Sequence, residues 1–133
     1  WGGRLVDRLG PRAMLLFAWG VYAAVYAGLA FAEGRAEAVA IFLAYGFYYG
    51  FSEPAERAWV AALAPREGRG AAFGLYHAVT GLALLPASVL CGLLWSRFGP
   101  AAGFLAGAAL SGAASLLLLR VSAPGASEPP AAR

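Results

Sequence analysis

Residues 70–96 read GAAFGLYHAVTGLALLPASVLCGLLWS, which is 27 consecutive positions without aspartate, glutamate, lysine or arginine. Three more uncharged runs lie at residues 13–32, 38–52 and 98–119. Because an α-helix rises about 1.5 Å per residue, roughly 20 residues cross the hydrocarbon core of a bilayer. Three of the runs reach that length unaided, and the second reaches it with one further turn at either end. The runs therefore predict helices that span a membrane.

The composition supports this interpretation. The 133 residues are 61% hydrophobic and only 13% charged, whereas an ordinary soluble domain is about 25% charged. A soluble bundle does not fit, because helices made from these runs would have no polar face. The apolar composition and the single cysteine exclude a disordered chain and a disulfide-stabilised fold. We expect an all-α integral membrane protein with four transmembrane helices.

The charged residues and prolines mark the expected boundaries. Pro54 should bend or interrupt the second helix, and a bent continuation beyond it stays open. The expected segments are a cytoplasmic loop at 1–12, transmembrane helices at 13–32, 37–53, 70–95 and 99–120, a cytoplasmic connection at 54–69, and a disordered cytoplasmic tail at 121–133.

The arginines predict the orientation of these helices. Four spans place the first loop, the middle connection and the tail on one side of the membrane. Eight of the ten arginines lie on that side: Arg4, Arg8, Arg12, Arg57, Arg66, Arg69, Arg120 and Arg133. Because cytoplasmic loops carry the excess of basic residues, both termini are expected in the cytoplasm, in a bacterial cell (inner) membrane. These arginines are interpreted as topology determinants, and no nucleic-acid partner is expected.

Small residues repeat every fourth position in the last run, at Gly99, Gly103, Gly107, Ser111 and Ser115. Such stripes let membrane helices approach closely. Similar spacings recur in the other runs, so packing within one bundle is favoured over a dimerisation face.

Residues 3–12 read GRLVDRLGPR and resemble the loop signature of the major facilitator superfamily, G-x-L-x-D-R-x-G-R-R. The matching positions are Gly3, Leu5, Asp7, Arg8, Gly10 and Arg12, and Pro11 departs from the pattern. Independently of any family, Gly10 permits a tight turn, and Arg8 and Arg12 are expected at the anionic headgroups. We call residues 3–12 the signature loop.

The resemblance implies a twelve-helix transporter fold in which this loop occurs twice. Only four spans follow it here, so the resemblance implies the second copy, with helices nine to twelve behind it. Residues 64–95 and 98–110 are similar to the family's eleventh and twelfth helices. The implied function is secondary active transport of a small solute by alternating access. The implied partners are the lipid bilayer, the remaining helices of the same transporter and an unknown small molecule, with a coupling proton left open.

Two alternatives stay open from the sequence. One is a complete four-helix transporter of the small multidrug resistance type, although that mechanism needs an acid deep in the first helix and residues 13–32 contain none. The other is a membrane scaffold or assembly subunit without transport activity, for which the signature loop would be coincidence.

A charged group is expected at the cytoplasmic end of the second helix. Glu53 and Arg57 are four residues apart, in the order that favours a helical ion pair. The family resemblance implies that they join Asp7 in a cluster that holds the inward gate closed. The alternative is an interfacial ion pair of little energetic weight.

Three residues are candidates for lining a solute cavity. His77 is the only ionisable group well inside a run, and such residues are functional candidates by default. It could couple a proton or contact solute, or be a neutral packing residue. Tyr45 and Tyr49 share a helix face, and the resemblance implies that this helix borders the central cavity; interface or packing roles are the alternative.

No catalytic pattern is present in the sequence. Cys91 is the single cysteine and His77 the single histidine, which is too few for a metal site. There is no nucleophile–base pair and no phosphate-binding loop. Neither enzymatic activity nor a cofactor or metal is expected.

Overall fold

The structure, a computed structural model, describes residues 6 and 8–121. Four residues of the signature loop, Gly3, Arg4, Leu5 and Asp7, lie outside this range, as does the tail from residue 122. The described residues form helices and no strand. The elements are α2 (Pro11–Phe31), α3 (Arg35–Leu63), the short 3-10 helix η1 (Arg66–Gly68), α4 (Arg69–Phe98) and α5 (Pro100–Arg120).

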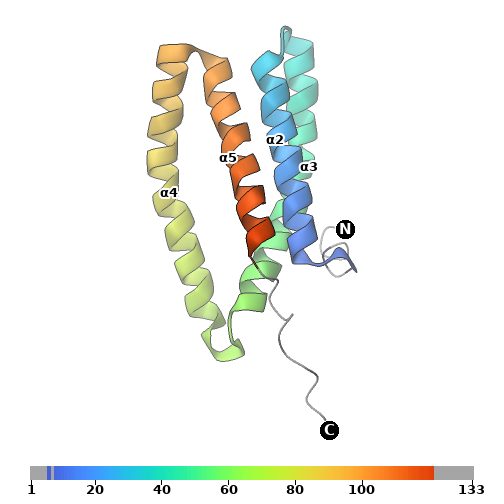
Figure 1. The fold of residues 1–133 in the computed structure, drawn as a ribbon, viewed down its shortest axis with the longest axis vertical. Coiled ribbons are helices and arrows are strands. Elements are labelled where there is room, and N and C mark those ends of the chain that lie inside the picture. The colour runs from blue at the N-terminus through green and yellow to red at the C-terminus, as the bar shows by residue number, and fades with distance from the viewer. Residues whose placement is uncertain (1–5, 7, 122–133) are drawn as a thin grey trace.

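The helices run alternately up and down (Figure 1). The connection between α2 and α3 and the turn between α4 and α5 lie at one end of the structure, and η1 lies at the opposite end with the start of α2 and the end of α5. Arg35 and Arg97 belong to the first end, whereas Arg12, Arg66, Arg69 and Arg120 belong to the second. The arginines are thus unequally divided between the two ends.

Glycine and proline define two of the helix starts. Gly10 and Gly99 have φ angles of 80° and 84°, in the region that favours glycine. Pro11 and Pro100 follow them directly in the first turn of α2 and α5, where the missing N–H costs nothing. Gly99 alone therefore joins α4 to α5.

The connection expected at residues 54–69 is shorter in the structure. α3 continues through Pro54 to Leu63, so only residues 64–68 join α3 to α4. The extension is stabilised by packing, because Ala55 is fully buried in the core beside Ala58 and Trp59. Tertiary contacts of this kind compensate for the backbone hydrogen bond that proline removes.

Three of the helical segments are long and apolar enough to cross a membrane: Pro11–Phe31, Arg66–Phe98 and Pro100–Arg120. α3 is 29 residues long but does not meet that standard, because charged residues and tyrosines interrupt its apolar sequence. These findings establish an all-α membrane fold, and a transmembrane position for α3 remains a prediction.

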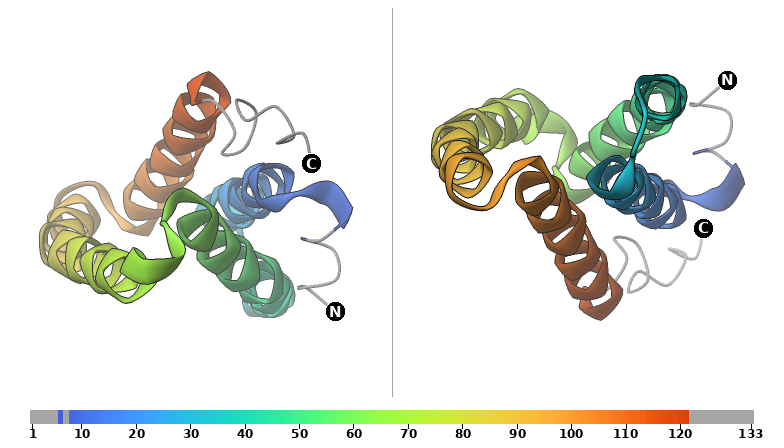
Figure 2. Two further views of the ribbon diagram at one scale, coloured as in Figure 1. Left: turned by 90° about the horizontal axis from the view of Figure 1, so that it is seen from below. Right: turned by 90° about the horizontal axis from the view of Figure 1, so that it is seen from above.

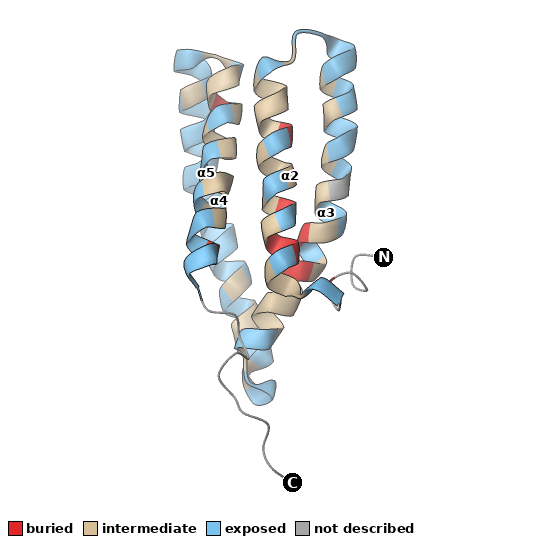
Figure 3. Cartoon of the chain, turned by 45° about the vertical axis from the view of Figure 1, so that its right-hand side comes forward, coloured by how far each residue is buried: buried red, intermediate tan, exposed pale blue. Residues whose placement is uncertain are grey.

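α2 lies beside both α3 and α5, and α4 contacts α5 and one end of α3 (Figure 2). The buried cluster gathers at the end of α2 that follows the signature loop (Figure 3). Its members are Val6, Met14, Leu15, Ala55 and Leu118. By contrast, α4 has no buried residue and exposes many leucines. The core therefore joins the beginning of the described chain to its last helix.

Candidate functional site

The small residues of α5 contact two different neighbours. Gly103 is buried and faces α4, where a Cβ atom at Gly103 would lie 3.4 Å from the Cys91 sulfur and 3.7 Å from the Trp95 ring. Gly99 forms the turn between the two helices. The first part of the ladder thus lies at the α4–α5 contact.

The next two positions of the ladder, Gly107 and Ser111, contact α2. A Cβ atom at Gly107 would lie 2.7 Å from the Tyr26 ring. The Ser111 hydroxyl donates a 2.8 Å hydrogen bond to the Trp19 carbonyl on α2, and the Ser115 hydroxyl donates to the Ser111 carbonyl at 2.9 Å. Hydrogen bonds and close backbone approach are the interactions available between helices in lipid, so Gly107 and Ser111 carry the α2–α5 contact, whereas the Ser115 hydrogen bond stays within α5.

Arg12, the last residue of the signature loop, binds the end of α5. Its guanidinium donates hydrogen bonds to the carbonyl oxygens of Leu118 and Leu119, at 3.1 and 2.7 Å. The Leu118 carbonyl also accepts a 3.2 Å hydrogen bond from the Val121 N–H just past the helix, so Arg12 is its second donor, and Arg12 supplies a donor to the Leu119 carbonyl at a helix end where carbonyls lack partners within the helix. Arg8 and Arg12 were both expected at the headgroups from the sequence; Arg8 is exposed, but Arg12 is half-buried and binds α5.

Part of the predicted charge cluster lies within the described residues. An Arg57 guanidinium nitrogen lies 2.6 Å from a Glu53 carboxylate oxygen, and the two side chains are 64% and 61% exposed. Asp7 lies outside the described residues, so the structure places two of the three members. An ion pair with this exposure contributes about 0–1 kcal/mol.

A second polar contact, which joins α3 to α4, was not anticipated from the sequence. The Tyr76 hydroxyl of α4 donates a 2.5 Å hydrogen bond to a Glu56 carboxylate oxygen of α3. His77 follows Tyr76, and their rings meet edge to face at 5.0 Å. His77 itself is exposed on α4. Nothing in the local sequence around Glu56 indicates that its partner lies twenty residues further along the chain.

Tyr45 lies in a cluster of tyrosine rings from α2 and α3. Its ring centroid is 5.9 Å from that of Tyr26, 5.5 Å from Tyr48 and 5.3 Å from Tyr49. The hydroxyls of Tyr45 and Tyr49 are 3.5 Å apart. Tyr22 stacks on Tyr26 with centroids 4.0 Å apart. The two α2 tyrosines were missed from the sequence, although their spacing of four residues puts them on one helix face.

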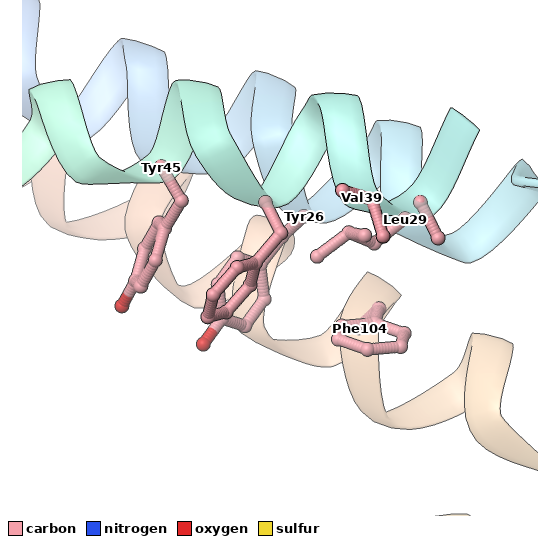
Figure 4. Close-up of a pocket in the computed structure, with 7 residues that line it drawn as sticks. Tyr26, Leu29, Val39, Tyr45 and Phe104 are labelled. Atoms are coloured by element: carbon pink, nitrogen blue, oxygen red, sulfur yellow. The ribbon is translucent and has the colours of Figure 1, made fainter. Parts of the chain in front are cut away.

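A cavity of about 370 Å³ opens beside this cluster (Figure 4). Tyr45 lines it and Tyr49 and His77 do not. Its lining residues are Tyr26, Leu29, Ala38, Val39, Phe42, Tyr45 and Phe104. We call this space the aromatic cavity. Of the three cavity candidates from the sequence, the structure therefore brings one to a cavity wall.

A smaller cavity of about 270 Å³ lies between α2, α4 and α5, beside Tyr22, Tyr26, Cys91 and Gly107. Among residues 6 and 8–121, no group of three or more histidine, cysteine, aspartate or glutamate side chains is placed to hold a metal ion. The larger cavity is lined by apolar and aromatic side chains that include two tyrosines, and the smaller one is lined in addition by Ser88 and Cys91.

Comparison with known proteins gives two matches. The family model described as Major Facilitator Superfamily matches residues 1–133. An uncharacterized MFS-type transporter of Methanocaldococcus jannaschii is 34% identical over 117 residues, which cover 88% of this chain. The chain spans 29% of that relative's length. No solved structure matches the chain.

Proposed function

Because the chain belongs to the major facilitator superfamily, we propose that it forms part of a secondary transporter that moves a small solute across the membrane by alternating access. The observation that carries the proposal is the family match over residues 1–133, on a chain with three helices able to span a bilayer. The match favours this function over a four-helix multidrug resistance transporter or a scaffold subunit. Repeats that rock about a central solute site give such transporters alternating access.

In this proposal the chain supplies the last four helices of a twelve-helix protein. Two observations support it: the chain spans 29% of its relative, and α4 exposes apolar side chains along its whole length. The remaining helices and lipid would cover those side chains. The end that holds Arg12, Arg66 and Arg120 would face the cytoplasm, in accord with the arginine bias. We refer below to this protein as the complete transporter.

The polar contacts at the cytoplasmic end support an inward gate. We infer that Asp7 joins the Glu53–Arg57 pair when the gate is closed, and that Glu56 and Tyr76 hold α3 to α4 beside it. The exposed pair is weak by itself. The free energy that the pair contributes increases when the other half of the transporter closes over it and excludes water, because charge interactions are stronger at low dielectric.

Replacing Asp7 with asparagine is expected to slow solute exchange by about tenfold, equivalent to about 1.4 kcal/mol. The amide cannot form the ion pair that stabilises the closed gate. The measurement is counterflow in liposomes that contain the complete transporter, with a panel of labelled solutes. Counterflow needs no knowledge of the coupling ion, because it follows exchange of solute across the membrane.

Glu67→Gln is the matched control, because Glu67 is exposed in η1 at the same end and also loses one negative charge. Exchange in this variant should equal that of the unmodified protein. Equal rates for the Asp7 and Glu67 variants would contradict the gate. Absence of exchange for every solute tested with the unmodified protein would count against transport itself.

A further inference from the structure

We propose that α4 contains a hinge, which lets its first half swing away from α3 when the inward gate of the transporter opens. This inference rests on the transport function proposed above. The hinge segment is residues 80–86. We call residues 69–79 the α3-side half and residues 87–98 the α5-side half, after the helix that each half contacts.

Two features weaken the helix within the hinge segment. The Thr80 hydroxyl donates hydrogen bonds to the carbonyl oxygens of Tyr76 and His77, at 2.9 and 3.1 Å, and such bonds from a threonine often bend a helix. Pro86 lies inside α4 and has no N–H to donate to the Leu82 carbonyl. Proline and side chains that enter the backbone ladder are the usual causes of helix kinks. α4 therefore bends more easily here than an uninterrupted helix would.

The two halves of α4 contact different helices. In the α5-side half, the Trp95 ring lies against Phe104 and Gly103 of α5, and its centroid is 5.8 Å from that of Phe104. In the α3-side half, the Tyr76 hydroxyl donates its hydrogen bond to Glu56 of α3. α4 and α5 are close at the turn that joins them and diverge toward the other end (Figure 1). A bend between the halves thus moves the α3-side half without disturbing the contact with α5.

The hydrogen bond between Tyr76 and Glu56 is suited to act as a latch. It joins two half-buried side chains, and a hydrogen bond to a charged group is stronger than one between neutral groups. Glu56 is held in place, because Ala55 and Trp59 on the same helix belong to the packed core. Breaking the bond leaves the α3-side half tethered to α3 by the short connection at residues 64–68, free to swing about the hinge segment.

Distances between spin labels test the hinge in the complete transporter, with its native cysteines replaced by alanine. One pair of labels, placed on cysteines introduced at positions 67 and 120, follows the start of α4 relative to the end of α5. The other pair, at positions 35 and 97, follows the opposite end of the structure. All four positions, Arg35, Glu67, Arg97 and Arg120, are exposed. We expect two populations of distance for the first pair and one population for the second.

Two variants should shift the populations of the first pair in opposite directions. Pro86→Ala restores the backbone hydrogen bond and should reduce the longer-distance population by about threefold or more. Tyr76→Phe removes the latch and should raise that population by about threefold or more. Pro54→Ala is the matched control, because it also replaces a proline inside a helix. The buried Ala55 beside Pro54 fixes that helix, so the populations should not change.

The outcomes separate the hinge from the transport function. A single distance for the first pair, in both the unmodified protein and Tyr76→Phe, would overturn the hinge. Equal effects of Pro54→Ala and Pro86→Ala would also overturn it, as would distances that change together at both ends of α4, because the helix would then move as a rigid body.

Counterflow in liposomes tests whether the hinge belongs to the transport cycle. Exchange should slow by about tenfold in Pro86→Ala, equivalent to about 1.4 kcal/mol. An unchanged rate in a transporter that exchanges solute would remove the hinge from the cycle and leave the transport function intact. If the label distances respond as expected but the unmodified protein exchanges no solute, the hinge stands and the transport function fails.

Discussion

Replacing Arg12 with leucine is expected to lower the free energy of unfolding of the complete transporter by about 2–3 kcal/mol. The guanidinium donates two hydrogen bonds to the last carbonyls of α5, and hydrogen bonds to charged groups contribute about 1.5–3 kcal/mol. Leucine leaves these carbonyls without that donor and removes a positive charge from the negative end of the helix dipole. Thermal unfolding of the purified protein gives the loss of stability. Hydrogen exchange of the amides near the end of α5 gives its location.

Arg8→Leu is the matched control, because it removes the same charge from the same loop and its side chain is exposed. We expect almost no change in stability from this variant. Arg12→Lys keeps the charge but replaces the one guanidinium nitrogen that donates both bonds with an ammonium on a shorter side chain, so it should fall between leucine and arginine. If the Arg8 and Arg12 leucine variants lose equal stability, the basic charge of the loop matters and the contact with α5 does not.

The sequence predicted the helices better than their ends. Uncharged runs locate the four helices because burial in lipid excludes charge over about 20 residues. However, a charge marks the depth at which the membrane ends, and a helix can continue past it. α2 therefore includes Arg12 and α4 includes Arg97. Pro54 suggested an end for α3, but core packing of Ala55 carries that helix on to Leu63.

Contacts within one helix were more predictable than contacts between helices. The Glu53–Arg57 pair follows from their spacing alone. The partners of Arg12 lie 106 and 107 residues away on α5, and no local pattern specifies which faces meet. For the same reason Tyr45 could be named as a cavity candidate, but its neighbours on α2 and α5 could not. Small-residue spacing identified packing positions on α5 without identifying what packs there.

Replacing Gly107 with leucine is expected to lower the free energy of unfolding by at least about 1–3 kcal/mol, the usual cost of overpacking a core. Even a Cβ atom would lie 2.7 and 2.9 Å from two carbons of the Tyr26 ring. The ring is confined, because it stacks on Tyr22 and meets the edge of Phe104. α2 and α5 must therefore separate to admit the side chain. Thermal unfolding of the complete transporter measures the cost.

Gly112→Leu provides the comparison on the same helix. Gly112 is half-buried, and a Cβ atom there would contact nothing within 4 Å. Replacing a helical glycine removes an entropic cost of about 0.5–1 kcal/mol, so this variant should be neutral or slightly stabilising. Gly107→Ala gains the same helix preference against a smaller clash, and its stability should lie between those of glycine and leucine at this position. If leucine is tolerated equally at 107 and 112, α2 and α5 lie further apart in the complete transporter, and the Tyr26–Phe104 wall of the aromatic cavity would open with them.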